Sequence, residues 1–327
     1  MARPVQRVAI TGATGFIGRY LTAYLLDRGI EVLAVVRPGS PNQAHAGATV
    51  VTAPLETTAL VDAFSKVDGV VHLAGIVAAI RAADYAAVNV EGTRAVATAA
   101  ARGAARLVHV SSLAAAGPAP ADAPRREEDA PRPITPYGQS KLESERTVEQ
   151  TPGLRWTILR PGVVYGPGDH GMLPLFRMAA RGLLPLVGRR DAAYTFVFVD
   201  DMARAAHAAL TAEGAAAEGR TCFVGHADPV MAGDVLAALR QALPRRRSIV
   251  VPVPGALVRA LAHAGDVAGW LSGRPALLNQ WRARELFAEG FVCRVDRLRD
   301  CLGVTANVGL QDGIARTADW YLREGWL

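Results

Sequence analysis

Residues 8–18 have the sequence VAITGATGFIG, in which a short β-branched run leads into three evenly spaced glycines. In a turn of this kind the first glycine permits a tight bend, the second lets the backbone approach a pyrophosphate, and the third lets a helix pack closely on a strand. Free N–H groups at the start of the helix then face the phosphate charge. The stretch therefore predicts a dinucleotide site. Its expected members are Gly12, Thr14, Gly15, Phe16, Ile17 and Gly18.

Outward from this turn, short β-branched runs alternate with longer Ala-rich helical patterns as far as about Leu159. Such alternation predicts βαβ units and a parallel sheet covered on both faces, that is, a Rossmann-type doubly wound α/β fold. The expected strands are Arg7–Thr11, Glu31–Val36, Thr49–Thr52, Gly69–Leu73, Leu107–Ser111 and Thr157–Arg160. The expected helices are Phe16–Arg28, Thr58–Phe64, Asp84–Arg102 and Tyr137–Glu149. Residues 117–136 contain six prolines and predict an irregular surface loop.

A chain of 327 residues exceeds the size at which one core usually stops growing, so a large domain with a smaller one is expected. Residues 1–166 are expected to form the dinucleotide-binding domain. Residues 195–225 return to it, with strand patterns at Thr195–Val199 and Thr221–Val224. Residues 167–327 are otherwise expected to form mainly a smaller C-terminal substrate-binding domain.

Composition excludes several other classes of protein. Apolar runs stop near a dozen residues and no secretory signal is present, so we expect a cytoplasmic protein without a transmembrane span. Cys222, Cys293 and Cys301 lack metal-ligand spacing and are interpreted as free thiols, with no metal site. The net charge of +6 is spread along the chain, and only Arg245–Arg247 form a run, so nucleic acid is not an expected partner.

The residue after the second expected strand selects between the two nicotinamide cofactors. An acid there binds the ribose 2′-hydroxyl of NAD, whereas an arginine accepts the 2′-phosphate of NADP. Arg37 occupies this position, and no carboxylate lies between Glu31 and Glu56. NADP(H) is therefore favoured and NAD(H) is possible. The alternative is that Arg37 is an ordinary surface cation in a chain with 34 arginines.

Tyr137 and Lys141 lie four residues apart near the start of an expected helix, and hence on one face of it. Lys141 is one of two lysines in this arginine-rich chain, which indicates a need for a compact, titratable ammonium group. A free phenol has a pKa near ~10, and a neighbouring ammonium stabilises its phenolate form. Ser111 and Ser112 end the preceding strand, where a hydroxyl could bind a substrate oxygen. Together these residues predict a proton-transfer site.

These motifs resemble those of extended short-chain dehydrogenase/reductases in the NAD-dependent epimerase/dehydratase superfamily. The similar segments are TGATGFIG, VVHLAG, NVEGT, VSSLAAAG, YGQSK, LRPGVVYGPGD and FVFVDDMARA, which span about Thr11 to Ala205, and the closing TADWYLREGWL. The segment SSLAAAGP also resembles hydroxysteroid-dehydrogenase-like and dihydroflavonol-reductase-like members, whose substrates are less polar.

The resemblance implies a role for each matching residue. Tyr137 would be the acid/base, Lys141 would bind the nicotinamide ribose and lower the pKa of Tyr137, and Ser112 would orient the substrate oxygen. Ser112 is preferred to Ser111 because it lies five residues before the family glycine matched by Gly117. Asn89 matches a position that supports the proton relay.

The remaining implied cofactor contacts come from three segments. They are Leu55, Leu73, Ala74, Gly75, Pro161, Val163 and Val164. Leu55 stands near the place where the family usually has an acid that holds the adenine, so only backbone contacts are expected there. The resemblance also implies a homodimer formed through the helices at residues 84–102 and 137–149.

Three functions fit these motifs. The first is an NAD(P)-dependent oxidoreductase that moves hydride between nicotinamide and a carbonyl or secondary alcohol of a small, rather apolar substrate. The second is a nucleotide-sugar epimerase or dehydratase, and the third is a non-catalytic NADP(H)-sensing binding protein. Nucleotide-sugar members often carry Asn and Arg where this chain has Val163 and Tyr194, which favours the first function, although Arg189 and Arg190 could compensate. The intact Ser112, Tyr137 and Lys141 set disfavours the third.

Residues 248–281 are rich in Val, Leu, Ala and Trp. The favoured interpretation is that they pack into the core of the second domain. A lid over a hydrophobic substrate and contact with a membrane surface are the alternatives.

Overall fold

The computed structural model describes residues 5–40, 44–189, 192–212, 217–243 and 248–327. Its central feature is a seven-stranded sheet in the order β11-β6-β5-β4-β1-β2-β3, in which all pairs are parallel. The strands are β1 (Arg7–Thr11), β2 (Glu31–Val36), β3 (Thr49–Thr52), β4 (Gly69–His72), β5 (Arg106–Val110), β6 (Trp156–Pro161) and β11 (Arg220–Val224). The Rossmann-type prediction is confirmed.

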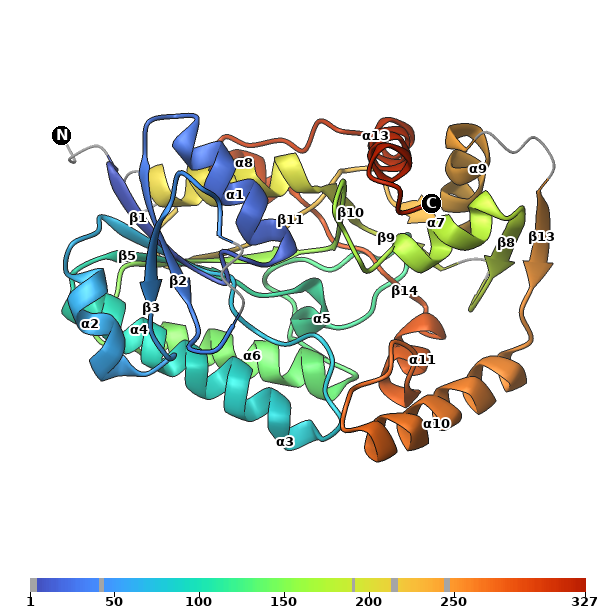
Figure 1. Ribbon diagram of the computed structural model, residues 1–327, viewed down its shortest axis with the longest axis horizontal. Coiled ribbons are helices and arrows are strands. Elements are labelled where there is room, and N and C mark those ends of the chain that lie inside the picture. The colour runs from blue at the N-terminus through green and yellow to red at the C-terminus, as the bar shows by residue number, and fades with distance from the viewer. Residues whose placement is uncertain (1–4, 41–43, 190–191, 213–216, 244–247) are drawn as a thin grey trace.

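Helices cover both faces of this sheet (Figure 1). One face packs on α1 (Phe16–Leu26) and α8 (Val199–Thr211), through a core that includes Leu21 and Met202. The other face packs on α2 (Thr57–Phe64), α4 (Gly92–Arg102) and α6 (Pro136–Glu149). The chain runs outward in opposite directions from β1 and from β4, so the switch point lies between these two strands, where ligands bind doubly wound sheets.

Three predicted elements differ from the structure, one of them the expected helix Phe16–Arg28, which ends two residues earlier at Leu26. The expected helix Asp84–Arg102 consists of α3 (Ala82–Tyr85), a wider π-helical segment η1 (Ala86–Glu91) and α4. The expected strand Thr195–Val199 is shorter, because β10 (Phe196–Phe198) gives way to α8 at Val199. β10 pairs with β7 (Val163–Tyr165) outside the main sheet. The other predicted strands hold to within one residue at each end.

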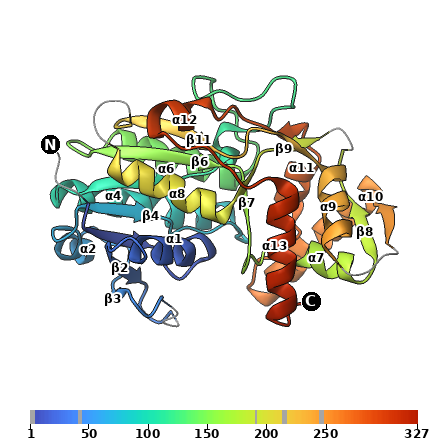
Figure 2. The same cartoon turned by 90° about the horizontal axis from the view of Figure 1, so that it is seen from above.

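The remaining elements form a second lobe beyond the carboxyl ends of the central strands (Figure 2). Its helices are α7 (Leu173–Ala180), α9 (Ala232–Ala242), α10 (Gly255–Ser272), α11 (Gln280–Leu286) and α13 (Leu310–Arg323). Its small sheets join β12 (Val230–Met231), β9 (Ala193–Tyr194) and β14 (Gly290–Phe291), and separately β13 (Ile249–Pro252) and β8 (Leu183–Leu186). α12 (Asp296–Leu302) returns to the main sheet, beside β11 and α8.

The prediction that residues 248–281 pack into the core of the second lobe is wrong for most of the segment. Val258 and Ala262 form a buried cluster with Ala283 of α11, and Val253 and Leu278 pack against this cluster while partly buried. The other large apolar side chains of β13 and α10 are exposed, because α10 has a packing partner on only one side.

The loop at residues 117–136 is irregular as predicted, and it touches the β14 region through isolated bridges from Ala119 and Arg125. The three cysteines are free thiols, also as predicted. In the part of the chain that the structure describes, no helix has the length and apolar character needed to cross a membrane.

Candidate active site

The glycine turn brings β1, α1 and the segment after β4 into close contact. Gly12 has a φ of +77°, and a Cβ atom there would lie 2.7 Å from the backbone nitrogen of Ala74. A Cβ on Gly18 would lie 2.1 Å from the carbonyl oxygen of Gly12. The structure thus places Leu73 and Ala74, both predicted cofactor contacts, directly beside the turn, and Gly75 follows them against Asn89.

Gly15 is the N-cap of α1 and has no side chain with which to cap the helix. Its own ideal Cβ position meets only the carbonyl oxygen of Gly12, at 3.2 Å. A side chain at Gly15 would crowd this turn, and the N–H groups of the first turn of α1 have no side-chain cap, so they can stabilise a pyrophosphate by hydrogen bonds and by the helix dipole. These residues fit the diphosphate of a nicotinamide dinucleotide.

The other predicted cofactor residues lie on several elements of the same lobe. Arg37 is exposed immediately after β2. Leu55 is partly buried against the helix that begins at Gly92. Pro161 ends β6, and Val163 and Val164 lie on β7. Thr14, Phe16 and Ile17 belong to the glycine turn and to the first turn of α1.

Ser112 and Tyr137 meet at the carboxyl end of β5. Ser112 is the N-cap of the short helix α5 (Leu113–Ala116), and Tyr137 lies in the first turn of α6, which Thr135 caps by accepting a hydrogen bond from the Gly138 N–H. Burial raises the pKa of Tyr137 to about 12, and a hydrogen bond with Ser112 partly opposes this rise. The phenol is therefore protonated at neutral pH.

Lys141 is buried one turn further along α6, and its ammonium donates a hydrogen bond of 2.8 Å to the Val110 carbonyl oxygen. Burial lowers the pKa of Lys141 to about 8, and the negative charge of Glu145 partly opposes this. The expected lowering of the Tyr137 pKa by Lys141 is not found in this structure. The reason is that burial dominates at the phenol, while the ammonium is held by a backbone carbonyl.

Ser111 faces away from Tyr137, although it precedes Ser112 directly. Its hydroxyl donates to Glu145, which also accepts two hydrogen bonds from the guanidinium of Arg160, at 2.9 and 2.6 Å. This ion pair is buried between α6 and β6. Ser111 is thus committed to a structural network, and Ser112 is the serine that remains beside the phenol.

Asn89 is buried within η1, whereas most asparagines on a helix lie at its surface. Its amide exchanges two hydrogen bonds with the backbone of Ile76, of 2.8 and 3.1 Å, and donates a third of 3.0 Å to Ser140 of α6. Asn89 therefore joins the segment after β4 to the helix that carries Tyr137 and Lys141. The π-helical segment is an example of the local distortion that often marks functional positions.

Sequence reasoning missed a pair of buried histidines beneath this site. His72 and His109 are paired in register on β4 and β5, and their rings stack with centroids 5.3 Å apart. Each Nε2 atom lies 2.9 Å from a hydroxyl whose own proton is donated to a backbone carbonyl: Thr93 for His72 and Ser144 for His109. Both rings must therefore carry the proton on Nε2.

The charge state of these histidines follows from their burial. Burial lowers the pKa of His72 to about 3, and the positive charge of Lys141 lowers it further. The pKa of His109 is likewise well below its usual value, for the same two reasons. The motifs VVH and LVHV could have signalled the pair, because each places a polar residue within the last two positions of a fully buried strand.

Aromatic side chains from two other elements surround Tyr137. The ring of Tyr85 lies 6.0 Å from that of Tyr137 and 5.7 Å from that of Trp281 on α11. Thr135, just before α6, donates a hydrogen bond of 3.0 Å to Glu285, which lies on α11 like Trp281. The second lobe thus borders the candidate active site through α11, a contact that no motif predicted.

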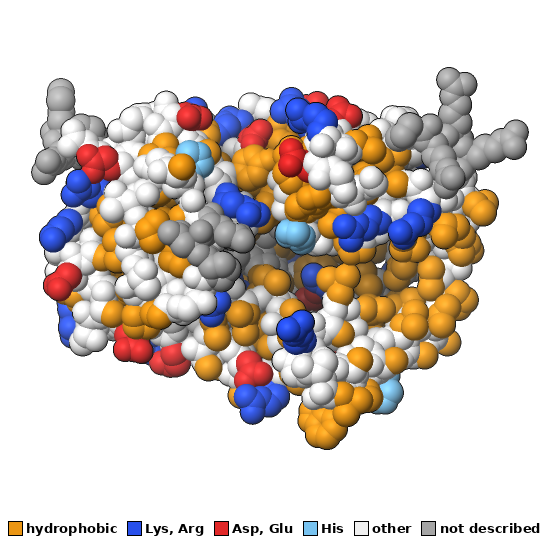
Figure 3. All heavy atoms as spheres, viewed as in Figure 1, with side chains coloured by type: hydrophobic (Ala, Val, Ile, Leu, Met, Phe, Trp, Pro, Cys, Tyr) orange, Lys and Arg blue, Asp and Glu red, His pale blue; other side chains and the backbone are white. Residues whose placement is uncertain are grey.

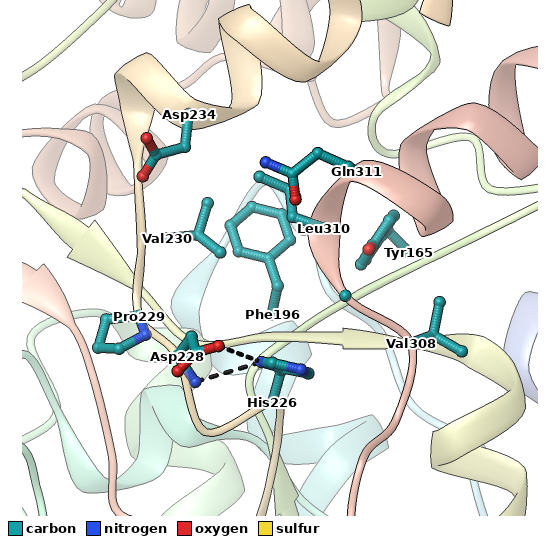
Figure 4. Close-up of a pocket in the computed structure, with 11 residues that line it drawn as sticks. Tyr165, Phe196, His226, Asp228, Pro229, Val230, Asp234, Val308, Leu310 and Gln311 are labelled. Atoms are coloured by element: carbon teal, nitrogen blue, oxygen red, sulfur yellow. Dashed lines mark hydrogen bonds and ion pairs between the residues drawn. The ribbon is translucent and has the colours of Figure 1, made fainter.

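A separate cavity of about 180 Å³ lies between β10, β12 and the start of α13 (Figure 4). Phe196, His226 and Gln311 are among its lining residues, and it contains none of the predicted catalytic residues. Of the positions linked to nucleotide-sugar binding, Val163 is partly exposed on β7 and Tyr194 is partly buried on β9. Arg190 and the Arg245–Arg247 run lie outside the described residues.

Comparison with known proteins agrees with this geometry. The model of the NAD dependent epimerase/dehydratase family matches residues 8–225. Ceramide reductase of Caulobacter vibrioides is 32% identical over 332 residues, which cover 98% of this chain and 96% of that protein. The 2-alkyl-3-oxoalkanoate reductase of Stenotrophomonas maltophilia is 30% identical over 240 residues, covering 69% and 72%.

Among solved structures, MoeE5 in complex with UDP-glucose and NAD has a TM-score of 0.76 and 25% sequence identity, covering 97% of this chain and 99% of that one. The family match includes the glycine turn, Asn89, Ser112, Tyr137 and Lys141. This chain is therefore a member of the NAD-dependent epimerase/dehydratase family, an enzyme family of the extended short-chain dehydrogenase/reductase kind.

Proposed function

We propose that this chain is an NAD(P)-dependent reductase that acts on a carbonyl group of a small, rather apolar substrate, or catalyses the reverse oxidation of a secondary alcohol. The observation that carries the proposal is the protonated Tyr137 phenol, hydrogen-bonded to Ser112 and bordered by Tyr85. When bound, the nicotinamide dinucleotide supplies or accepts the hydride.

The residues of the chain then perform the proton transfer. Ser112 donates a hydrogen bond to the substrate oxygen and holds it beside the phenol. Tyr137 donates its proton to that oxygen as negative charge develops on it, which is general acid catalysis by a positioned group. The buried ammonium of Lys141 adds a positive charge one helical turn away. Asn89 acts as a positioning residue, because it fixes α6 relative to the segment after β4.

An apolar substrate is supported by the surroundings of the phenol. Tyr85 borders it and is itself packed against Trp281, and Val163 and Tyr194 stand where nucleotide-sugar enzymes often bind a diphosphate. Both relatives named above are reductases, and their names describe a ceramide and an alkyl-substituted oxoalkanoate. We infer a substrate with a carbonyl group on an alkyl chain.

We also propose NADP(H) as the preferred cofactor, on the strength of the exposed Arg37 after β2.

Residues 1–166 and 195–225 are proposed as the dinucleotide-binding part and the rest of residues 167–327 as the substrate-binding part. A homodimer through α4 and α6 is proposed as well.

The test is an assay at 340 nm with NADPH and a series of alkyl ketones, for the wild type and for Tyr137→Phe. The variant should lose turnover by roughly 10²–10⁴-fold, because the proton donor is removed, and should keep its affinity for NADPH. Tyr24→Phe, a change to a tyrosine on α1, is the matched control and should retain full activity.

Other outcomes would identify the alternatives. Conversion of a nucleotide sugar without net change in absorbance would replace this proposal with the epimerase or dehydratase function. Tight NADPH binding with no turnover of any carbonyl, alcohol or nucleotide sugar would favour the sensing function.

A further inference from the structure

Large apolar side chains gather on the outer surface of β13 and α10. We call this surface the docking face. Its members are Ile249, Val250, Val251, Leu257, Leu261, Val267, Trp270, Leu271 and Leu277. Trp270 is 74% exposed and Leu271 72%. Figure 3 shows a broad hydrophobic area over these elements at the lower right of the molecule. Contiguous apolar areas of this kind mark sites of interaction with a protein or a membrane.

α10 is apolar on two sides, whereas a surface helix with one packing partner is normally polar on its outer side. Its inner side packs through Val258 and Ala262 against α11. Its outer side carries Leu257, Leu261 and Leu271, which follow one another at helical spacing with alanines between them. The outer side therefore has the composition of a helix that contacts a second apolar phase.

The segments around the docking face also carry most of the net positive charge of the chain. Residues 170–189 and 248–286, which contain α7, β8, β13, α10 and α11, hold seven arginines against Asp266 and Glu285. Their formal charge of +5 compares with +6 for the whole chain, and Arg282 is paired with Glu285. Basic side chains beside apolar ones suit the anionic headgroups of a lipid bilayer.

The charge also disfavours a second copy of this chain as the occupant. Two such faces in contact would bring like charges together, and like-charge juxtaposition opposes association. A bilayer with anionic lipids offers the opposite charge together with an apolar interior. An exposed tryptophan fits this occupant, because its amphipathic ring is favoured at a membrane–water interface.

A chain of contacts links the docking face to the candidate active site. α10 packs on α11, and Trp281 of α11 contacts Tyr85, which in turn contacts Tyr137. α11 and the two aromatic rings thus lie between the apolar surface and the phenol.

We propose that the docking face binds the surface of an anionic bilayer and presents the catalytic site to carbonyl substrates dissolved in it. The last part rests on the proposed reductase function, whereas the binding itself does not. The chain lies on the bilayer and does not span it.

Vesicle flotation tests the binding without substrate or cofactor. The full chain is mixed with vesicles of phosphatidylcholine alone or with about 30% phosphatidylglycerol, for the wild type, Leu261→Asp/Leu271→Asp and Arg274→Ala/Arg284→Ala. Leu322→Asp, on the exposed side of α13, is the matched control. Far-ultraviolet circular dichroism and turnover of a short, water-soluble ketone verify that each variant is folded and active.

The wild type and the control should float with the anionic vesicles. The leucine variant should partition at least tenfold more weakly, since charges must enter the apolar phase, and each arginine removed should weaken binding about fivefold. Ketone turnover should stay unchanged in all variants, which separates the fate of this proposal from that of the reductase function.

Failure of the wild type to float would overturn the proposal, as would flotation that the leucine variant retains. A wild-type dimer that becomes monomeric in the leucine variant, with no vesicle binding, would assign the docking face to a second copy instead. Size-exclusion chromatography with light scattering distinguishes that outcome.

Discussion

Arg37 lies exposed at the end of β2, the strand next to β1 and its glycine turn. At this place a guanidinium can pair with a 2′-phosphate through two parallel hydrogen bonds, while a carboxylate would repel it. We therefore expect one side chain, at the scale of a single residue, to decide between two cofactors that differ by one phosphate.

Arg37→Asp should reverse the cofactor preference. The affinity for NADPH should fall by about 1.5–3 kcal/mol, the range for hydrogen bonds to charged groups, or roughly 10- to 100-fold. The affinity for NADH should stay constant or rise. Fluorescence titration with both nucleotides measures this, and Arg28→Asp on the same lobe is a control. An unchanged ratio would show that Arg37 is an ordinary surface cation.

At the scale of elements, η1 joins the helix that carries Tyr137 and Lys141 to the segment after β4. The wider turn of the π-helical segment lets Asn89 lie beneath the chain rather than at its surface. There it satisfies the N–H and the carbonyl of Ile76 and also contacts Ser140 of α6. One amide thus relates β4 to the helix that carries Tyr137.

Asn89→Ala should destabilise the protein and misplace the catalytic helix. Leaving two backbone groups without partners costs about 1–3 kcal/mol for each one that water cannot reach. Urea unfolding should therefore show a loss of about 2 kcal/mol or more, and kcat should fall more than KM rises. Asn307→Ala, at an exposed position, should change stability by less than about 0.5 kcal/mol. Wild-type stability in the Asn89 variant would contradict the role given to this amide.

At the scale of the whole molecule, the buried histidine pair links folding to pH. His72 and His109 lie in the middle of the central sheet, with at most 1% of either side chain exposed. Their pKa values in the folded state lie far below the usual 6.5. Below about pH 6.5 the unfolded chain takes up protons that the folded chain does not, so stability falls as the pH falls from 6.5 toward the folded-state pKa.

Between pH 7.5 and 5.5 the pair should lower the free energy of unfolding by about 3 kcal/mol, or about 1.4 kcal/mol for each histidine. Urea titrations at the two pH values measure this difference. His109→Gln should remove about half of it, whereas His226→Gln, at a partly exposed position, should leave it intact. An equal free energy at both pH values would show that the histidines are not neutral in the folded state.

Residues that act over a short length of chain were predictable. The glycine turn lies within one strand–helix connection, and Tyr137 and Lys141 share one helix, so residue spacing alone brings their groups together. The strand pattern was equally informative, because strands buried on both faces have continuous apolar runs.

Four features required the tertiary structure, since each depends on segments that are distant in sequence. His72 stacks on His109 because β4 and β5 lie side by side. The different roles of Ser111 and Ser112 arise because Ser111 donates its hydroxyl hydrogen bond to Glu145, which is paired with Arg160. The burial of Asn89 needs the π-helical segment, which helical periodicity does not predict. The exposure of α10 could not be foreseen because periodicity identifies an apolar face but not its neighbour. Local chemistry is thus encoded in residue spacing, whereas burial, pKa and accessibility arise only when distant segments pack together.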